Sequence, residues 1–540
     1  MKILHITASY KPAYVYGGPV MSVAKLCEEV QAESERLKAE SERLKAESRR
    51  EDVGNQKTGD GRPRDNRGID VNLMTISPKT EDRSLTTHNS EHTTDNLQPR
   101  TISPKTADRS LATDNSELTT DNLQPRTISP KTADRGLGSD SETFLENEGF
   151  DSAQPDKMIV SVYTTLANGK EELPYQNGET KMVDGVEVTY FKRITKDHSH
   201  LSPALLWHLW KTVKQFDVVH IHAWWNLVSM PACLIALCRG VKVVLSPRGT
   251  LSLYSFEKDK SLLKKVFHQL LGKHLLNACY FHTTSAKEAI DTQALLKPKT
   301  IFNIPNFVNL PWEKSFIKKE KNDGVLKLIF LSRIEEKKGL ELLFKVLKTL
   351  DFAWELSIVG EGEVGYVERL KLEGDGGPKT GDRGPKTEDR GPRSEDGRLG
   401  GERQEIVSED GIRGKELTKR IHWLGPVYGD EKFDLMAAHD VFILPSYDEN
   451  FANVVIESLY TGTPVAITEN VGLSDYVKEK NLGWVCKREA ADLKTSLQKA
   501  YQDILNKKMQ PERLQYTIRN DFKERNILKH YQAMYMDLSI

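Results

Sequence analysis

The sequence is poor in cysteine, in long apolar runs and in net charge. Its five cysteines are scattered along the 540-residue chain, without the spacing of a metal site or of a disulfide framework. No stretch approaches the roughly 18–20 consecutive apolar residues that a membrane span needs. A net charge of −1 gives no general attraction for nucleic acid or for an anionic membrane. We therefore expect a cytoplasmic protein with reduced, mostly buried cysteines.

No signal peptide is expected either, because residues 1–6 (MKILHI) have the pattern of a short buried strand. The hydrophobic content of 38% and the mean hydropathy of −0.53 are low for a globular enzyme of this size. We interpret them as a globular part diluted by polar segments. The length leaves room for two ordinary domains and additional sequence.

Two repetitive stretches supply the polar excess. The first begins with AESERLK at 32–38 and again at 39–45, which predicts a solvated helical extension because each heptad holds one leucine. A 26-residue unit beginning at Thr75 then returns at Thr101 and starts again at Thr127. Its only apolar positions are Ile and Leu, so stacked copies would bury almost nothing. We predict that 32–157 is a mostly disordered insertion.

The second stretch repeats GPKTGDR with a seven-residue period from Gly377. We assign 374–415 to a second low-complexity insertion. The first insertion leaves two candidates for the second strand of the sheet, 69–74 and 158–163. The later one is favoured because 164–169 continues directly into ordered-looking sequence.

Outside the insertions, strands and helices alternate in two blocks. Strands are expected at 2–7, 186–191, 218–222, 241–246, 280–284, 301–304, 326–331, 355–359, 421–424, 441–444 and 464–468. The fold class is therefore α/β, with two doubly wound, parallel-sheet, Rossmann-like domains that face a cleft. We place the first domain at 1–312 and the second at 313–510. A helical tail at 511–540 is expected to cross back to the first domain.

One segment of the second domain offers both carboxylates and free amides. The strand at 441–444 leads into a polar loop, and a helix follows, with Asn453 expected as its N-cap. Glu449 lies on the loop and Glu457 lies one turn into the helix. In open α/β sheets, ligands bind at this end of the strands, and helix N-termini bind phosphate. The segment thus suits a diphosphate flanked by sugar hydroxyls.

Further candidate residues follow other strands. Arg333 and Lys338-Gly339 follow the strand at 326–331, and the two cations would neutralise a leaving diphosphate. Turn glycines follow three more strands: Gly17 and Gly18 near the N-terminus, Gly360 and Gly362, and Gly425. Each of these sites, taken alone, also fits an ordinary solvated or tight turn.

Two histidines end a strand of the first domain. His220 and His222 share a face of the strand, and His222 lies at its carboxyl end. A structural role and a role in the cleft are both open for His222. We expect no metal site here, because no third ligand has a recognisable spacing.

Taken together, these residues resemble the family-4 retaining glycosyltransferases of the GT-B fold. The resemblance covers essentially everything outside the insertions. It depends on Glu449-x7-Glu457, Arg333-x4-Lys338-Gly339, Gly360-Glu361-Gly362, Gly425, Gly17-Gly18 and the His-x-His strand end. It implies a nucleotide-diphospho-sugar as donor substrate, held by the second domain, with no cofactor and no metal.

The resemblance also implies roles for individual residues. Arg333 and Lys338 would hold the diphosphate, Glu449 the donor sugar and Glu457 the ribose. His222 would contact the sugar, and Gly17 and Gly18 would let the first loop approach the donor phosphate. The backbone amides of Phe451, Ala452, Asn453 and Val454 would approach the phosphates.

The chain departs from the family pattern in its central motif. The usual Glu-Gly-Phe-Gly reads Glu449-Asn450-Phe451-Ala452, and Ala452 tolerates a positive φ less well than glycine. Further on, Asp475 stands in place of a glutamate. We expect both changes to affect donor preference more than activity.

The expected function is transfer of a sugar to a glycan or lipid-linked acceptor, in bacterial exopolysaccharide or lipopolysaccharide biosynthesis. A sugar-nucleotide epimerase and a non-catalytic sugar-nucleotide-binding protein are the alternatives. A phosphorylase would need a pyridoxal lysine site, which the sequence does not reveal. The basic, apolar stretch at 258–276 is either a core-facing helix or a contact with the inner membrane face. No nucleic-acid partner is expected.

Overall fold

The computed structural model describes residues 1–14, 18–56, 158–197, 199–254, 266, 268–317, 324–374 and 420–539, with only the backbone described for 47–56. Several predictions lie outside the described residues. They concern Gly17, the 26-residue and GPKT repeats, the alternative strand at 69–74, and residues 258–265 and 267 of the stretch at 258–276.

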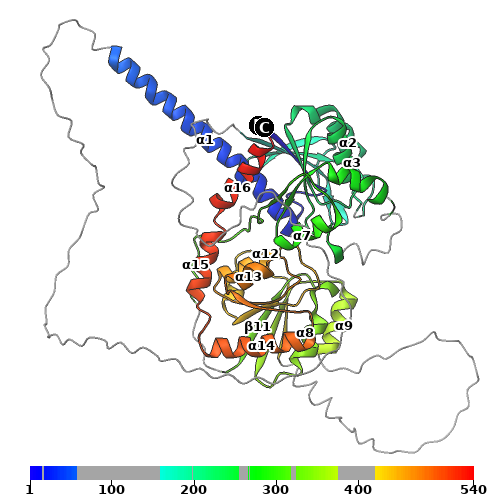
Figure 1. Ribbon diagram of the computed structural model, residues 1–540, viewed down its shortest axis with the longest axis vertical. Coiled ribbons are helices and arrows are strands. Elements are labelled where there is room, and N and C mark those ends of the chain that lie inside the picture. The colour runs from blue at the N-terminus through cyan, green and yellow to red at the C-terminus, as the bar shows by residue number, and fades with distance from the viewer. Residues whose placement is uncertain are drawn as a thin grey trace, which may run out of the picture. The chain divides into compact units, whose positions relative to one another are not determined.

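The first domain is built on an eight-stranded sheet (Figure 1) with the order β10-β9-β8-β7-β1-β2-β6-β5. Its strands are β1 (Lys2–Ile6), β2 (Ile159–Thr165), β5 (Glu179–Val183), β6 (Val186–Phe191), β7 (Val218–His222), β8 (Lys242–Ser246), β9 (Tyr280–Thr283) and β10 (Ile301–Asn303). All neighbours are parallel except β5, which runs antiparallel to β6 at the edge. The strand order reverses between β1 and β7, so their carboxyl ends border a crevice.

The second domain repeats this arrangement with six parallel strands in the order β13-β12-β11-β14-β15-β16. They are β11 (Leu326–Leu331), β12 (Trp354–Val359), β13 (Ile421–Gly425), β14 (Val441–Leu444), β15 (Val465–Thr468) and β16 (Gly483–Cys486). Counted along the domain, this is the 3-2-1-4-5-6 order of a Rossmann sheet. The reversal lies between β11 and β14, the two strands that precede the predicted donor motifs.

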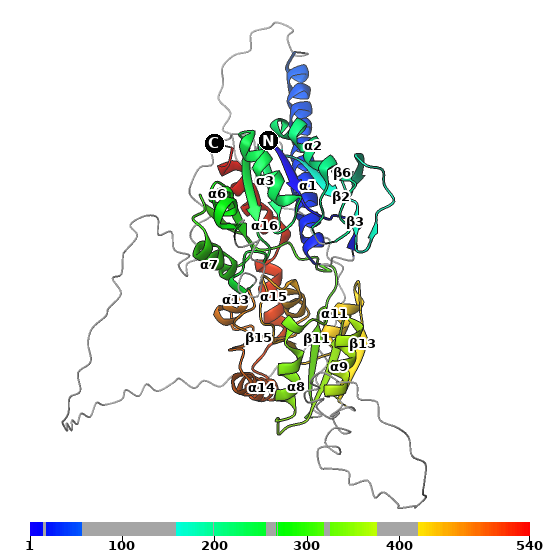
Figure 2. The same cartoon turned by 90° about the vertical axis from the view of Figure 1, so that its right-hand side faces the viewer.

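Helices cover both faces of each sheet (Figures 1 and 2). Those of the first domain are α1 (Gly18–Gln56), α2 (Pro203–Thr212), η2 (Val213–Gln215), α3 (Ser229–Cys238), the π-helix η3 (His268–Gly272), α6 (Lys273–Asn277) and α7 (Ala286–Leu295). Those of the second are η4 (Glu336–Lys338), α8 (Leu340–Leu347), α9 (Val364–Gly374), α11 (Glu431–Ala437), α12 (Asn453–Tyr460), α13 (Ser474–Glu479) and α14 (Ala490–Leu505). A small two-stranded sheet joins β3 (Ala167–Asn168) to β4 (Glu171–Glu172).

Alternation along β1 and β7 divides their side chains between two layers. Leu4 and Ile221 belong to the apolar cluster that includes α2 and α3. Ile3 and Val218 belong to the cluster on the opposite face, with residues of α1. At the carboxyl ends, this second face carries histidines instead of aliphatic residues.

The C-terminal tail returns to the first domain. It forms α15 (Pro511–Asp521), which packs on α12, and α16 (Glu524–Asp537). Figures 1 and 2 both show α16 beside the first sheet, where Glu524 pairs with Lys25 of α1 at 2.9 Å. Two tyrosines of α16 reach the histidine face of that sheet.

The choice of 158–163 as the second strand is confirmed, since β2 lies between β1 and β6. The helical extension is also confirmed, because α1 continues through both AESERLK copies to Gln56. The predicted insertion therefore begins with about two dozen helical residues. The sequence analysis missed β5, β16, α7 and α13, which are short or only weakly amphipathic, and also α14, which is long and amphipathic.

The cysteines follow expectation in part. Cys27, Cys233 and Cys279 are buried, and all five are free thiols. Cys238 is exposed on α3. No helix among the described residues is long and apolar enough to cross a bilayer.

Candidate functional site

A cavity of about 1210 Å³ is lined by residues from the carboxyl ends of both sheets. The structure brings nine of the predicted residues to its wall: Gly18, Arg333, Lys338, Glu449, Phe451, Ala452, Asn453, Val454 and Glu457. In sequence these residues are up to 439 positions apart, and the two strand-order reversals bring them together. The prediction of a site at this edge of the second sheet agrees with this placement.

Two loops of the second domain meet at the strand-order reversal. Gly339 caps η4 with a φ of 75°, and a Cβ at this position would lie 2.2 Å from the carbonyl oxygen of Pro445. Only glycine permits this combination of left-handed backbone and close approach. The contact fixes the loop after β11 against the loop after β14, which places Lys338 beside Glu449.

Lys338 and Glu449 form an ion pair at the cavity wall. The lysine is only 6% exposed, and burial lowers its pKa while the nearby Glu449 opposes that shift. The pair sets a cation next to a carboxylate, so one ligand could contact both through a phosphoryl oxygen and a sugar hydroxyl. Such groups are worth most where water is excluded.

The other charged residues of this wall are also paired. Glu457 accepts from Lys432, with 2.7 Å between Oε1 and Nζ. Arg333 pairs with Glu335 at 2.8 Å, and its side chain is 66% exposed, so it lies at the mouth of the cavity. Lys432, which the sequence analysis did not single out, follows the turn at Gly429-Asp430.

The start of α12 differs from the prediction. Asn453 is the first residue of the helix and not its N-cap; the cap is Ala452, which has a φ of 66° and no side-chain bond to the helix. The Asn453 amide instead contacts the first domain, with Oδ1 accepting from Asn306 at 3.3 Å and Nδ2 donating to Ser22 at 3.0 Å. These tertiary hydrogen bonds outweigh the capping preference.

Asn450, which stands where the family pattern has glycine, also contacts the first domain. Its side-chain amide donates to Thr284 Oγ1 at 2.8 Å, and its carbonyl oxygen accepts from Ser285 Oγ at 2.8 Å. The neighbouring Asp448 pairs with Lys287 of α7 at 2.7 Å. The loop that carries Glu449 is therefore held by the first domain on both sides.

Three predicted glycines do not line this cavity. A Cβ on Gly360 would lie 1.9 Å from the Ser332 carbonyl oxygen, and one on Gly362 would lie 2.2 Å from that of Ile334. These two glycines allow neighbouring loops to pack closely. Gly425 has a φ of 70° and open space around it. All three shape the surrounding backbone in this structure.

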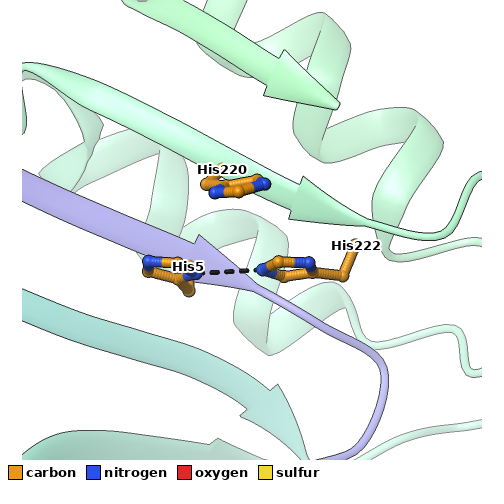
Figure 3. A group of neighbouring side chains, drawn as sticks. All are labelled: His5, His220 and His222. Carbon is orange, nitrogen blue, oxygen red and sulfur yellow. Dashed lines mark hydrogen bonds between the residues drawn. The ribbon is translucent and has the colours of Figure 1, made fainter. Parts of the chain in front are cut away.

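His222 is buried behind the cavity wall, with 2% of its surface exposed. Its Nδ1 accepts from Nε of Arg248 at 3.2 Å, and its Nε2 lies 2.9 Å from Nδ1 of His5 (Figure 3). Both ring nitrogens are therefore engaged within the protein. Arg248, which does line the cavity, lies between His222 and any ligand there.

A third imidazole lies beside the pair, although the spacing along the sequence revealed no third ligand. His5 of β1 lies opposite His220 of β7, and one ring nitrogen from each of the three histidines lies within 4.8 Å of the others (Figure 3). Spacing along the sequence could not reveal this, because the neighbouring strands are more than 200 residues apart. The adjacent Arg248 guanidinium opposes the binding of a cation.

Burial keeps these histidines neutral. It lowers the pKa of His5 and of His282 to about 3, with a smaller contribution from the charge of Arg248. The same causes hold the pKa of His220 and of His222 well below its usual value. Neutral imidazoles can both donate and accept, which suits a hydrogen-bonded cluster.

Arg248 is a functional candidate outside the motifs that carry the family resemblance. It follows β8 directly, in Pro247-Arg248-Gly249, at the same edge of the sheet as the histidines. A charged residue between proline and glycine at the carboxyl end of a buried strand is the signal that could have identified it.

Comparison with known proteins gives two family matches. Residues 158–311 match the model of "Glycosyltransferase Family 4", and residues 399–521 match that of "Glycosyl transferases group 1". The first match falls within the first domain, and the second falls in the second domain and extends through α15.

Among curated proteins, the chain is similar to an uncharacterized glycosyltransferase of Methanocaldococcus jannaschii, at 25% identity over 51% of this chain and 63% of that protein. It thus spans less than two thirds of this relative. An uncharacterized 41.2 kDa protein in the cps region of Klebsiella pneumoniae is 23% identical over 58% of this chain and 77% of that protein. Among solved structures, sucrose-phosphate synthase of Thermosynechococcus elongatus superposes with a TM-score of 0.50 at 15% identity, over 71% of this chain and 89% of the other. This last likeness concerns the fold.

Proposed function

Since this chain belongs to the family-4 glycosyltransferases of the GT-B fold, we propose that it transfers a sugar from a nucleotide-diphospho-sugar, with retention of configuration, to a glycan or lipid-linked acceptor. The observation that carries the proposal is the Lys338–Glu449 pair in a cavity lined by both domains. A diphosphate beside a sugar is the ligand that requires a cation and a carboxylate at adjacent positions.

The assignment of groups follows from their positions. Lys338, Arg333 and the first amides of α12 stabilise the charge that develops on the leaving diphosphate. Glu449 accepts hydrogen bonds from the donor sugar, and Glu457 accepts from the ribose. Arg333, at the mouth, exchanges its Glu335 partner for phosphate when the donor enters.

The residues that the first domain adds to the cavity wall favour retention of the sugar's anomeric configuration. Among the described residues, those that this domain adds to the wall include no Asp, Glu or His, the usual general bases. The acceptor hydroxyl then passes its proton to an oxygen of the departing diphosphate. The bond from the sugar's anomeric carbon to that oxygen breaks, and the bond to the acceptor oxygen forms on the same face.

We further propose that the reaction needs no cofactor and no divalent cation, because Lys338 and Arg333 supply the positive charge. Transfer measured with EDTA should then equal transfer measured with Mg²⁺. Activity that is lost with EDTA and restored by Mg²⁺ would contradict this part of the proposal.

The alternatives are an epimerase or a non-catalytic sugar-nucleotide-binding protein on the same fold. A Glu449→Gln variant discriminates between them: transfer should fall about 10²–10³-fold, while nucleotide binding through Glu457 persists. Glu335→Gln, at the exposed mouth, is the matched control and should retain most activity. If the wild type only hydrolyses or epimerises every donor tested, the transferase proposal fails.

We place the reaction in the synthesis of a bacterial surface glycan, exopolysaccharide or lipopolysaccharide, in the cytoplasm. The support is the similarity to a protein of the Klebsiella pneumoniae cps region. Screening UDP-, GDP- and ADP-sugars, followed by acceptor extracts, tests this placement. Transfer only to a small soluble metabolite would contradict it.

A membrane-facing surface is also proposed, on α2, α3 and α6, of which only α6 overlaps the stretch at 258–276. Trp207 is 62% exposed and Trp210 is 42% exposed, while Lys211 lies 4.8 Å from the Trp207 ring and Arg239 lies 5.0 Å from the Trp210 ring. α3 packs between α2 and α6 and adds the exposed Leu234. Exposed tryptophans beside cations suit an anionic bilayer surface.

The charge of this surface is one-sided. The sequence from 218 to 256 contains no Asp or Glu, although acidic residues make up 78 of the 540 in the whole chain. Each cation near an anionic bilayer contributes about 1 kcal/mol. Sedimentation with anionic vesicles should thus retain the wild type and lose a Trp207→Ala/Trp210→Ala variant. Tyr516→Ala, at an exposed position of α15, is the control. Equal sedimentation with neutral and anionic vesicles, or without lipid, rejects the surface.

A further inference from the structure

The cations that line the cavity differ in their pairing. Four of the five have a carboxylate partner: Arg333 and Lys337 with Glu335, Lys338 with Glu449, and Lys432 with Glu457. The fifth, Arg248, forms no ion pair with any residue that the structure describes. It is also the cation that the first domain contributes to the wall.

The Arg248 guanidinium is held at two of its three nitrogens. Nε donates to His222 Nδ1 at 3.2 Å, and Nη1 donates to Asn306 Oδ1 at 2.9 Å. Nη2 is buried and has no hydrogen-bond acceptor among the described residues. A buried donor without a partner is unfavourable by about 1–3 kcal/mol, and more when it is charged. The missing acceptor is what a ligand in the cavity would supply.

The backbone at this position is constrained as well. Arg248 has a φ of 51°, in the left-handed region that non-glycine residues seldom adopt, and Gly249 follows with a φ of 81°. Such strain is concentrated at functional sites. Gly249 donates its N–H to Glu288 at 2.8 Å, which secures the turn.

A directional chain of hydrogen bonds holds His222 behind Arg248. Arginine can only donate, so Nδ1 of His222 accepts and its Nε2 carries the proton. That Nε2–H donates to Nδ1 of His5 at 2.9 Å (Figure 3), which leaves the His5 proton on Nε2. His5 Nε2 then donates to the Tyr535 hydroxyl at 3.4 Å.

The chain continues beyond Tyr535 of α16. The tyrosine O–H donates to His220 Nδ1 at 2.7 Å, and His220 Nε2 donates to Ser246 Oγ at 2.6 Å. Ser246 donates to His282 Nδ1 at 2.6 Å, and His282 Nε2 donates to the Ile304 carbonyl at 3.0 Å. A carbonyl can only accept. Arg248 donates at one end and the Ile304 carbonyl accepts at the other, so all hydrogen bonds of the chain run in the same direction. Every imidazole nitrogen in the chain has a partner.

We propose that Arg248 binds a phosphoryl oxygen of a substrate through Nη2, and that Tyr535 is a positioning residue that holds Arg248 through His5 and His222. The inference rests on the proposed function, which supplies the phosphoryl group. The phosphate belongs either to the donor diphosphate or to a lipid-linked acceptor. The guanidinium edge suits phosphoryl oxygens better than neutral hydroxyls.

The anion site is tested with inorganic pyrophosphate, which needs no knowledge of the donor base. Pyrophosphate should raise the melting temperature of the wild type and of Arg239→Gln, an arginine outside the cavity. It should raise that of Arg248→Gln much less. Equal stabilisation of Arg248→Gln and wild type overturns the proposal, whether or not the chain proves to be a transferase.

The source of the phosphate is tested with nucleotides. UDP, GDP and ADP are titrated against the wild type, and the one that binds is compared with its nucleoside. If Arg248 binds the donor, Arg248→Gln weakens the diphosphate about 10- to 100-fold and the nucleoside less than twofold. If it binds the acceptor, diphosphate affinity is unchanged and the acceptor KM rises about tenfold. Equal weakening of diphosphate and nucleoside, or no change in either substrate, contradicts the proposal. A wild type that binds no nucleotide refutes the proposed function instead, and the pyrophosphate result still decides on the anion site.

The positioning role is tested by a double-mutant cycle. Tyr535→Phe should weaken pyrophosphate binding several-fold in the wild type and add nothing to the loss in Arg248→Gln. Tyr516→Phe, at an exposed position of α15, is the control and should leave pyrophosphate binding within twofold. If the effect of Tyr535→Phe adds fully to that of Arg248→Gln, or if Tyr535→Phe lowers only the melting temperature, Tyr535 does not act through Arg248.

Discussion

Each domain reverses its strand order inside the sheet, but the two domains bury polar groups at that reversal in opposite ways. The second domain uses ion pairs, Lys338 with Glu449 and Lys432 with Glu457. The first domain uses neutral imidazoles and one unpaired arginine. Ion pairs can exchange partners when a charged ligand arrives, whereas a chain of neutral hydrogen bonds holds one fixed geometry. The comparison indicates a second domain that rearranges around the donor and a first domain that presents a preformed contact.

Acid should have the largest effect, because it protonates the histidines of the first domain and removes the neutral state on which their hydrogen bonds depend. The pKa of His5 and of His282 is about 3 in the folded protein, and those of His220 and His222 are also lowered. The unfolded chain therefore binds more protons below pH 6.5. Their contribution to stability is complete above pH 6.5 and is lost as the pH falls toward about 3.

Each histidine should remove about 1.4 kcal/mol per pH unit in this range. Four of them lower the free energy of unfolding by about 5 kcal/mol between pH 7.5 and 5.5. Urea denaturation at the two pH values measures the difference. His282→Gln should reduce it by about a quarter, and His274→Gln, an exposed position, should leave it unchanged. Equal stability at both pH values would show that the cluster is not held neutral.

Removal of one charge tests the ion pairs of the second domain. Lys338→Met leaves Glu449 buried without its partner and should lower the free energy of unfolding by about 3–5 kcal/mol. Lys338→Met/Glu449→Gln should regain much of that stability without regaining activity. If the single and double variants are equally unstable in chemical denaturation, the pair is not the reason for the loss.

Two glycines near the second domain's site test whether such residues serve backbone packing or contact the ligand. Gly360→Ala places a Cβ against a carbonyl oxygen and should lower the stability by about 3 kcal/mol. Gly425→Ala meets no neighbour and should lower it by about 1 kcal/mol, for its left-handed φ alone. If both substitutions reduce nucleotide binding equally without affecting stability, the glycines contact the ligand and do not serve packing.

The smallest effect is expected at Ala452, whose φ of 66° favours glycine. Ala452→Gly should stabilise the protein by up to about 1 kcal/mol, because relief of the backbone strain outweighs the entropy that glycine adds to the unfolded chain. Gly339→Ala is the opposite substitution in the facing loop and should be strongly destabilising. A loss of stability in Ala452→Gly would mean that the alanine methyl contributes packing that outweighs the strain.

The sequence was sufficient for features that depend on local pattern. The alternation of strands and helices predicted both sheets, and the motifs around Lys338 and Glu449 predicted which strand ends form the cavity. Position 452 was recognised as unusual because its neighbours match a known motif. Each of these inferences uses residues close together in the chain.

Features that depend on strand neighbours could not be predicted in the same way. His5 meets His220 and His222 only because β1 lies beside β7, and Tyr535 joins them only because α16 returns to the first sheet. Asn453 fits the N-cap preference, but its hydrogen bonds to Asn306 and Ser22 decide its place. In each case the partner lies more than 100 residues away.

The most direct test of the account is calorimetric titration of a nucleoside diphosphate into the wild type, Lys338→Met, Arg248→Gln and the double variant. The diphosphate should bind the wild type, and Lys338→Met should weaken that binding. Arg248→Gln should weaken it as well if Arg248 contacts the donor, and should leave it unchanged if Arg248 contacts a phosphorylated acceptor. The nucleoside alone should bind all four proteins about equally. Diphosphate binding that is unaffected by Lys338→Met would contradict the account.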